Sequence, residues 1–439
     1  MSREEIHRKI FEYASICLAI CIPFSERMCT WLILLMATNW IAEGHFLRKI
    51  KAAYKNLFVI LCSTFYLLEI AGLLYTRHFT TGFYHAQTEA SFLVIPLLYF
   101  SYGKVKETQV NRILTAFSIA VFLASAYCMI IGIFNYENTK DLSYLFFHSL
   151  VSPIHQHPVY FSVYTFICIV YLFGRVSKSQ PAVTVILYML LLLYFSVLLF
   201  LLRSKIVVGT AFIYAVYQLV KNMIHHKPPF RWAIIYPLLL IGLILTVLFT
   251  SNPFSEQVYL LDKAELSVLN ESKFDPNDRF DDISIRLTLG KFCFGILNDH
   301  HAWVFGVSPG DAQPDINQRV SESGMFTGFP GTEDRGFLNY NLHNQYLQTM
   351  LNSGVAGLLL LAGILFMIFK KALRLKSKIL LSVIFVFTAF FLTESVLERQ
   401  MGILPFFFFI SILILQERVT VQKPPVKKEK YDKALENIC

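Results

Sequence analysis

Apolar runs separated by short charged connections make up most of the chain. A helix needs about 20 apolar residues to cross the hydrocarbon core of a bilayer, and most of the runs approach that length. The first, the fourth and the eleventh are shorter, so twelve membrane helices are predicted, with ten or eleven as alternatives. The fold class that follows is an all-α polytopic integral membrane protein. The predicted spans lie near residues 10–24, 28–43, 57–75, 89–102, 113–134, 156–173, 181–202, 206–220, 232–250, 346–369, 379–393 and 401–415.

The composition agrees with this class of protein. Of the 439 residues, 55% are hydrophobic and 16% are charged, and the mean hydropathy is +0.52, as is typical of membrane proteins. The eight cysteines have no CxxC spacing, which indicates buried thiols rather than a disulfide framework or a zinc site. The first apolar run follows basic residues but has no small-x-small cleavage site, so it is interpreted as a retained anchor.

The basic residues are concentrated in alternate connections. Together with the N-terminal segment and the tail after residue 417, these connections hold 26 of the 39 Lys and Arg. Because cytoplasmic loops of membrane proteins carry an excess of Lys and Arg, both termini are predicted to be cytoplasmic. The net charge of +9 is therefore a topology signal with a secondary attraction to anionic lipid, and it is no argument for nucleic-acid binding. The basic connections lie near residues 48–55, 104–112, 175–178, 221–231 and 370–378.

The largest polar insertion, about residues 251–342, then falls on the periplasmic side. It holds fourteen Asp and Glu against seven Lys and Arg, so it is the acidic region of a basic protein. Long loops between membrane spans are more often functional than idle. The predicted organisation is nine helices in 1–250, the loop in 251–342, three helices in 343–417, and a basic cytoplasmic tail in 418–439.

A histidine stands where this loop turns into an apolar run. In the stretch "NYNLHNQYLQTMLNSGVAGLLLL", Asn341 is expected to cap a helix, and Gly354 and Gly357 are expected to let another helix approach closely. His343 would then lie at a helix N-terminus at the outer membrane surface. The helix dipole favours a neutral imidazole there, which can accept a proton near neutral pH. The alternative is a polar anchor that binds a lipid headgroup.

Three cations stand in apolar or amphipathic surroundings. Arg203 and Lys205 lie in "FLLRSKIVVG", a short break between two apolar runs, and Arg286 lies in "DDISIRLTLGKF" within the large loop. Arg203 and Lys205 could simply extend their charges to the interface, and Arg286 could pair with Asp281 or Asp282. The functional interpretation is a set of cations for a diphosphate, because a guanidinium binds phosphate oxygens two at a time.

Aromatic residues near the outer ends of the predicted spans supply further candidates. In "HQHPVYFSVY", His157 and Tyr160 either line a cavity or belong to the interfacial aromatic belt, and the belt is favoured. Trp303 begins "WVFGVSPGD", a stretch with turn residues and no helical period.

Several of these segments together resemble the O-antigen ligase and polymerase superfamily. They are "LHNQYLQTMLNSGVAGLLLL", the preceding "IRLTLGKFCFG" and "FGVSPGD", and the following "LTESVLERQMGILPFFFFI". "HPVYFSVY" is similar to a segment of the ligase members, and the likeness covers about residues 155–415. It implies a metal-independent, inverting glycosyltransferase of the bacterial inner membrane with its active site at the periplasmic face. The implied donor is a polysaccharide on undecaprenyl diphosphate, and the implied acceptor is a sugar hydroxyl of lipid A-core.

The resemblance assigns roles residue by residue. His343 matches the essential loop histidine of the family and Arg286 its loop arginine. Family members usually have Ser-Arg after the seventh span, whereas this chain has Ser204-Lys205 with Arg203 before the serine. His343 is expected to act as base, and Arg286 with Arg203 or Lys205 to bind the diphosphate. Substrate contacts are expected from Asn344, His157, Tyr160 and Trp303.

No cofactor is expected, and cations must replace the metal, because the sequence contains no Asp-x-Asp to hold a metal-bound diphosphate. The main alternative is a polymerase, which takes a second lipid-linked glycan as acceptor, and a minor one is transfer to a protein hydroxyl. A polysaccharide-lipid flippase would also have about twelve spans. A transporter of this kind is expected to have ionisable groups near the membrane midplane and two similar halves, and the sequence shows neither pattern. An inert scaffold is the remaining class.

Overall fold

The computed structural model describes residues 2–176, 180–224, 231–249, 266–329 and 331–417. The N-terminal part, up to residue 249, is almost wholly helical in its described residues. Its elements are α1 (Arg3–Cys21), α2 (Glu26–Glu43), α3 (Phe46–Ala53), α4 (Leu57–Gly72), α5 (Phe79–Glu89), α6 (Ser91–Tyr102), β1 (Val105–Lys106), α7 (Glu107–Thr139), η1 (Leu142–Leu145), α8 (Phe147–Val151), η2 (Ser152–Ile154), α9 (Pro158–Arg175), α10 (Ala182–Leu201), α11 (Lys205–Ile224) and α12 (Trp232–Phe249).

The C-terminal part alternates a loop unit with long helices. Short parallel pairing between β1 and β2 joins the two parts, with Val105 opposite Gln416. The predicted basic tail, 418–439, lies outside the described residues. The elements are η4 (Leu266–Leu269), α14 (Ser284–Asp299), α15 (Ala312–Glu322), α16 (Gln345–Arg374), α17 (Lys378–Phe390), η5 (Val396–Glu398), α18 (Gln400–Leu415) and β2 (Gln416–Glu417).

Each of the twelve predicted apolar runs overlaps a helix. Polar caps begin many of them. The side chains of Ser25, Asn56 and Ser377 accept backbone N–H bonds at the starts of α2, α4 and α17, which satisfies donors that a helix leaves unpaired. The residues that follow each cap are mostly apolar over the whole length of the helix. The helical fold class is therefore confirmed.

The number of membrane crossings is a separate matter. Among the described residues, five helices are long and apolar enough to cross a membrane, or six if the bent pair α3 and α4, which meet at 97°, is one span. Other apolar runs form shorter helices, such as α17 and α18. These helices are shorter than the 18 residues required of a candidate membrane span, so the count of twelve spans stays a prediction.

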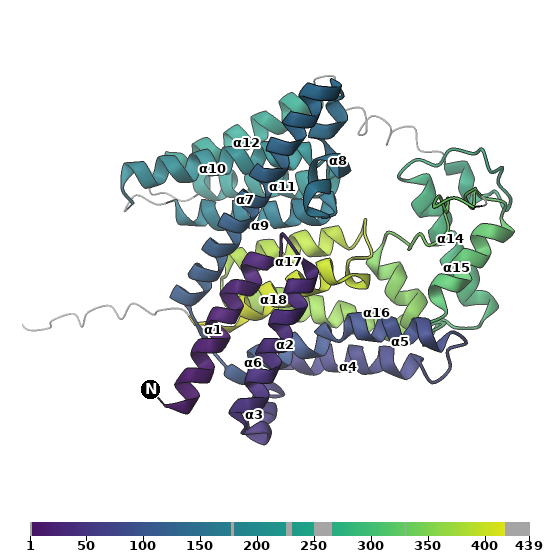
Figure 1. Ribbon diagram of the computed structural model, residues 1–439, viewed down its shortest axis with the longest axis horizontal. Helices are drawn as coiled ribbons and strands as arrows, with labels where there is room; N and C mark the ends of the chain where they lie inside the picture. Colours follow the sequence, from purple (N-terminus) through teal and green to yellow (C-terminus); the bar gives the residue numbers. More distant parts are fainter. Residues whose placement is uncertain (1, 177–179, 225–230, 250–265, 330, 418–439) are drawn as a thin grey trace, which may run out of the picture.

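The helix α18 lies at the centre of the bundle (Figure 1), and its residues 402–414 are all buried. Aromatic rings from three other helices contact it: Phe92 on α6, Phe117 on α7 and Phe387 on α17. A helix that is apolar on every side lies either in a protein core or against lipid, and α18 lies in the core. The run of four phenylalanines in this helix is thereby explained.

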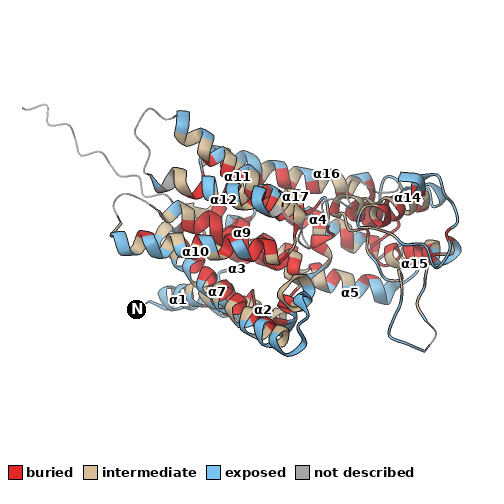
Figure 2. Cartoon of the chain, turned by 90° about the horizontal axis from the view of Figure 1, so that it is seen from above, coloured by how far each residue is buried: buried red, intermediate tan, exposed pale blue. Residues whose placement is uncertain are grey.

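The large loop forms a compact unit at one end of the bundle, as both views show (Figures 1 and 2). It has its own apolar core, which includes Leu289 on α14, Ile316 on α15 and Leu351 on α16. Asp311 holds this unit to the α4–α5 connection, because its carboxylate accepts the backbone N–H groups of Arg77 and His78 at 3.0 and 3.1 Å. Burial would raise the pKa of Asp311, but these donors and the Arg77 charge hold it below its ordinary value.

The helix α16 is broken where the loop unit packs against it. Gly354 has φ 63°, a left-handed conformation, and the backbone of residues 303–308 runs along the break. The N–H of Val355 donates to the carbonyl of Trp303 at 2.8 Å, and the N–H of Val307 donates to Leu351 at 2.9 Å. Gly354 was expected to admit another helix; it admits this loop backbone instead, because the irregular segment needs partners for its own N–H and C=O groups.

The two ends of the helical bundle differ: one bears the loop unit, and the other bears a cavity lined in part by basic residues. The starts of α9, α11 and α16 lie at the end that bears the loop unit. At the opposite end, a cavity of about 610 Å³ lies among the other ends of the same helices, lined by Arg175, Gln218, Lys376 and Lys378 among others. The predicted basic connections after 175 and after 370 thus share one end, as the charge pattern requires. Which end faces the cytoplasm stays a prediction.

Candidate active site

His343 lies in the last turn before α16. Its φ of 45° is in the left-handed region, which is costly for a residue with a side chain and is often found at functional sites. The Asn341 side chain accepts the backbone N–H of His343 at 2.9 Å, which stabilises this turn. The expected cap was Asn341, but Asn344 caps α16 by accepting the N–H of Leu347 at 3.0 Å. The helix starts three residues later than expected because the turn uses Asn341.

The imidazole of His343 faces a carboxylate. Nδ1 of His343 lies 3.3 Å from Oε2 of Glu394, and the two side chains are 27% and 12% exposed. Glu394 comes from the segment 391–399, which joins α17 to α18 and is held against the start of α16. Gln345 donates its N–H to Phe391 at 2.8 Å, and its side-chain oxygen accepts the N–H of Leu397 at 2.6 Å.

Glu394 is ionised in this setting. Burial alone would raise its pKa, but the hydrogen bond and the charge of His343, together with His157 and Arg286, outweigh burial and lower the pKa. When the neutral ring donates its Nδ1 proton to this carboxylate, Nε2 carries no proton. That nitrogen is then the one that can accept a proton from a substrate.

Two of the predicted cations converge on Asp282, just before α14. Lys205 donates to its carboxylate at 2.8 Å, and Arg286 donates from Nη1 to its backbone carbonyl. Nη2 of Arg286 donates to the carbonyl of Thr393 at 3.4 Å, which brings the guanidinium next to Glu394. Burial raises the pKa of Asp282, but the bond and charge of Lys205, then Arg286 and His343, lower it overall. Arg286 thus contacts Asp282 through its backbone carbonyl, whereas the pairing expected from the sequence was with the carboxylate of Asp281 or Asp282.

The third cation, Arg203, lies in the break between α10 and α11. Its φ is 54°, and its N–H donates to the carbonyl of Phe200 at 3.0 Å, which ends α10. Lys205 rather than Arg203 shares Asp282 with Arg286. The break itself was predicted from the sequence, and which of Arg203 and Lys205 binds the diphosphate stays a prediction.

His157 belongs to the same group of residues. It precedes α9, and its ring contacts His148 at 4.9 Å and Tyr160 at 5.5 Å between centroids. Burial lowers the pKa of His157 to about 4, although the nearby Glu394 opposes this. Tyr160 is 3% exposed and packs against Phe390. The favoured aromatic belt was wrong for Tyr160, because α9 lies inside the bundle and not at its lipid-facing surface.

Two other predicted substrate contacts have structural partners. The Asn344 amide caps α16 and also donates to the carbonyl of Leu392 at 3.2 Å. Trp303 donates to Asn298 at 2.9 Å and lies beside Val355, three turns along α16 from His343. The structure thus brings His343, Arg286, Lys205 and His157 together and holds Trp303 apart from them.

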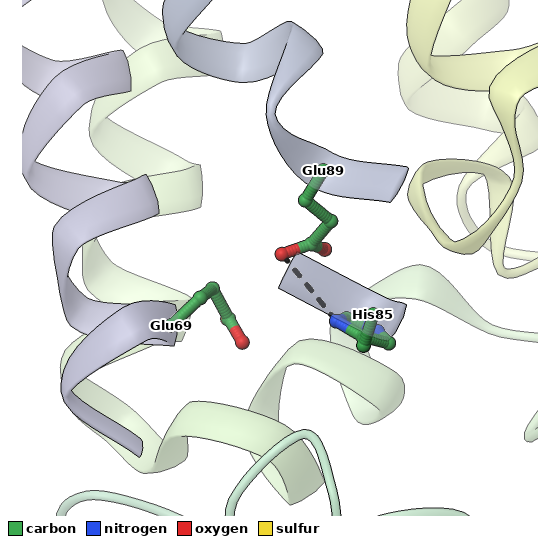
Figure 3. Close-up of side chains that lie close together, drawn as sticks. All are labelled: Glu69, His85 and Glu89. Atoms are coloured by element: carbon green, nitrogen blue, oxygen red, sulfur yellow. Dashed lines mark ion pairs between the residues drawn. The ribbon is translucent and has the colours of Figure 1, made fainter. Parts of the chain in front are cut away.

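Sequence reasoning missed four acidic residues. Glu394 lies inside the quoted "LTESVLERQ". It could have been found as a carboxylate in the short connection between the last two predicted spans, which falls on the same side of the membrane as His343. Glu69 interrupts an apolar run and Glu89 stands at the start of the next one, and a carboxylate within an apolar run is the usual mark of a functional residue. Glu69, His85 and Glu89 each offer a possible metal-ligand atom, and these atoms lie within 4.8 Å of one another (Figure 3). Glu398 contacts the same histidine.

The group around His343 can perform acid–base chemistry beside an anion site. A carboxylate-held imidazole can take a proton from a hydroxyl, and Lys205 and Arg286 can neutralise a negatively charged group next to it. Comparison with protein-family models and with curated proteins gave no match to this chain.

Proposed function

We propose that the protein is a membrane glycosyltransferase of the O-antigen ligase kind. It transfers a polysaccharide from undecaprenyl diphosphate to a sugar hydroxyl of lipid A-core, at the periplasmic face of a bacterial inner membrane. The observation that carries the proposal is the contact of His343 with Glu394 beside two cations, at the loop-bearing end of the bundle. His343, Arg286 and Lys205 were candidates from the sequence, whereas Glu394 was not.

The reaction is one displacement at the anomeric carbon. The acceptor oxygen forms the new C–O bond as the bond to the diphosphate oxygen breaks, and Nε2 of His343 takes the hydroxyl proton. Glu394 stabilises the imidazolium that forms, because an ionised carboxylate favours the positive ring. The leaving diphosphate is already an anion, so it needs positive charge rather than a proton. Displacement from the opposite face inverts the anomeric configuration.

Lys205 and Arg286 bind the diphosphate in this mechanism. Both now contact Asp282, whose side chain is 60% exposed. Asp282 thus holds the two cations close together before the substrate arrives, Lys205 through its carboxylate and Arg286 through its backbone carbonyl. A diphosphate carries more charge than one carboxylate and can take Lys205 from it, while Arg286 offers its planar fork to two phosphate oxygens. Arg203, two residues before Lys205 in the sequence, is the other cation expected to bind the diphosphate.

The test is a gel of surface lipopolysaccharide from a strain that lacks the gene. It is complemented with wild type, His343→Ala or His300→Ala, where His300 is a half-exposed histidine of the loop unit. For a ligase we expect bare lipid A-core and long chains that accumulate on the carrier lipid, restored by wild type and His300→Ala but not by His343→Ala. Core with a single repeat unit would indicate the polymerase instead. An unchanged ladder in the deletion strain would refute both transferases.

The stereochemistry gives a second test. The anomeric configuration of the new linkage is compared by NMR with that of the sugar on the carrier lipid. Inversion is expected from a single displacement. Retention would require two displacements and a covalent intermediate, and it would refute the role given to His343.

A further inference from the structure

A cluster of buried acidic residues lies apart from the predicted catalytic residues. Glu69 comes from α4, His85 and Glu89 from α5, and Glu398 from η5, and Figure 3 shows the first three side chains directed toward one another. Glu69 is 1% exposed and Glu89 is 2% exposed. In the described part of the chain, no lysine or arginine forms an ion pair with any of these carboxylates. Burial of such uncompensated charge is strongly unfavourable.

The partners of the four side chains leave three polar atoms of the cluster unpaired among the described residues. Nε2 of His85 lies 2.7 Å from Glu398, and one oxygen of Glu69 accepts the Ser353 hydroxyl at 2.6 Å. Nδ1 of His85, Oε2 of Glu69 and Oε2 of Glu89 are buried and have no hydrogen-bond partner in the part of the chain that the structure describes. Nδ1 of His85 lies 3.6 Å from the carboxylate of Glu89, too far for a hydrogen bond.

The tautomer of His85 explains this arrangement. If Nε2 donates its proton to Glu398, Nδ1 presents a lone pair to the same space as two carboxylate oxygens. A cation placed between these three acceptors would be bound by all of them. A histidine that binds a metal usually donates its other ring N–H to a carboxylate in this way, which fixes the ring for coordination.

We propose that Glu69, His85 and Glu89 bind one divalent cation of the zinc type. Their ligand atoms lie within 4.8 Å of one another. A tetrahedral zinc site with bonds of about 2.0–2.1 Å needs its ligands about 3.4 Å apart, so small rotations of the carboxylates complete it. One imidazole and two carboxylates favour zinc over magnesium or calcium, which prefer oxygen alone. A water molecule or other small ligand would take the fourth position.

The cation site is linked to the segment that carries Glu394. Glu398 accepts the side-chain N–H of Asn352 at 3.3 Å, and the amide of Gln348 donates to Asn352 at 3.1 Å. Gln348 in turn accepts the N–H of Leu342, next to His343, at 3.2 Å. The cation thus holds α4, α5 and the 391–399 segment together, and it is a structural site rather than a contact to the diphosphate.

Metal content tests the proposal without any activity measurement. The full-length protein is purified in detergent, stripped with a chelator, dialysed against Zn²⁺ and analysed by mass spectrometry, with Glu89→Gln, His85→Gln and the control His300→Gln beside wild type. We expect about one zinc per chain in wild type and in the control, and a loss of at least fivefold in both cluster variants. Size-exclusion profiles identify any variant that fails to fold.

Cobalt provides a check on wild type alone. Co²⁺ in a tetrahedral nitrogen and oxygen site gives visible absorption bands, and we expect them to appear in stripped wild type and to disappear on addition of Zn²⁺. Wild-type protein that takes up neither ion would overturn the proposal and would mean that protons compensate the carboxylates. Equal zinc uptake by folded His85→Gln would also overturn it. A cluster variant that loses glycan transfer but keeps its metal content would overturn the metal site and would leave the proposed transferase function untouched.

Discussion

The substitution Glu394→Gln tests the catalytic arrangement most directly. It keeps the size of the side chain and an oxygen that can accept from Nδ1 of His343, and it removes the negative charge. Nδ1 and the carboxylate lie 3.3 Å apart. With an effective dielectric constant of about 20, two opposite unit charges at that separation attract by about 5 kcal/mol. This energy is gained when His343 becomes positive in the transition state.

Partial exposure reduces that value. The His343 side chain is 27% exposed, so solvent screening leaves about half of the attraction, roughly 3 kcal/mol. Since each 1.36 kcal/mol is a factor of ten in rate, we expect Glu394→Gln to lower kcat by about 10²-fold, with little change in KM for the lipid-linked donor. The control is Glu322→Gln, an exposed carboxylate on α15 that does not contact this group.

The assay is transfer of a lipid-linked glycan to lipid A-core in proteoliposomes, with the product separated on a gel. His343→Ala is measured beside Glu394→Gln, and a double variant completes the cycle. The double variant should be no worse than His343→Ala, because the carboxylate acts through the ring. Activity of Glu394→Gln within threefold of wild type, while His343→Ala is inactive, would refute the role of the carboxylate.

Three further predictions concern neighbouring residues. Asp282→Asn frees Lys205 from its ion pair, so binding of inorganic pyrophosphate, measured by calorimetry, should tighten about fivefold, and weaker binding would contradict this. Burial lowers the pKa of His157 to about 4, so between about pH 6.5 and 4 the histidine is neutral in the folded protein and protonated in the unfolded chain. The free energy of unfolding therefore decreases as the pH falls through this range, by up to about 3 kcal/mol. The substitution His157→Gln should flatten this part of a curve of Tm against pH. Gly306→Ala places a Cβ 2.4 Å from the Asn352 carbonyl carbon at φ +72° and should lower Tm sharply, whereas Gly295→Ala, which meets nothing within 4 Å, should not.

Much of the local structure could be predicted from the sequence. Runs of apolar residues between charged connections gave twelve helical segments, and each overlaps a helix. A break between the spans 181–202 and 206–220 was also predicted, and it lies at residues 202–204; the acidic loop was predicted as a separate region. These features depend on neighbouring residues, because the length of an apolar run and the polar residues at its ends decide where a helix starts and stops.

Local patterns also misjudged details that depend on packing. Tyr160 has the sequence context of an interfacial aromatic, but α9 is buried among other helices, so the ring lies in the core. Gly354 has the context of a helix–helix contact, but the loop backbone occupies that position. In both cases the deciding neighbour is far away in the sequence.

The candidate site shows the same division. His343 and Arg286 were identified from the residues around them, but the contact of His343 with Glu394 was not. Glu394 reaches His343 across 51 positions, and Glu398 reaches His85 across 313. The sequence by itself determined which polar side chains stand at the ends of apolar helices. Only the tertiary structure decided which of them meet, because the pairing of charges in a helical bundle depends on which helix ends are packed side by side.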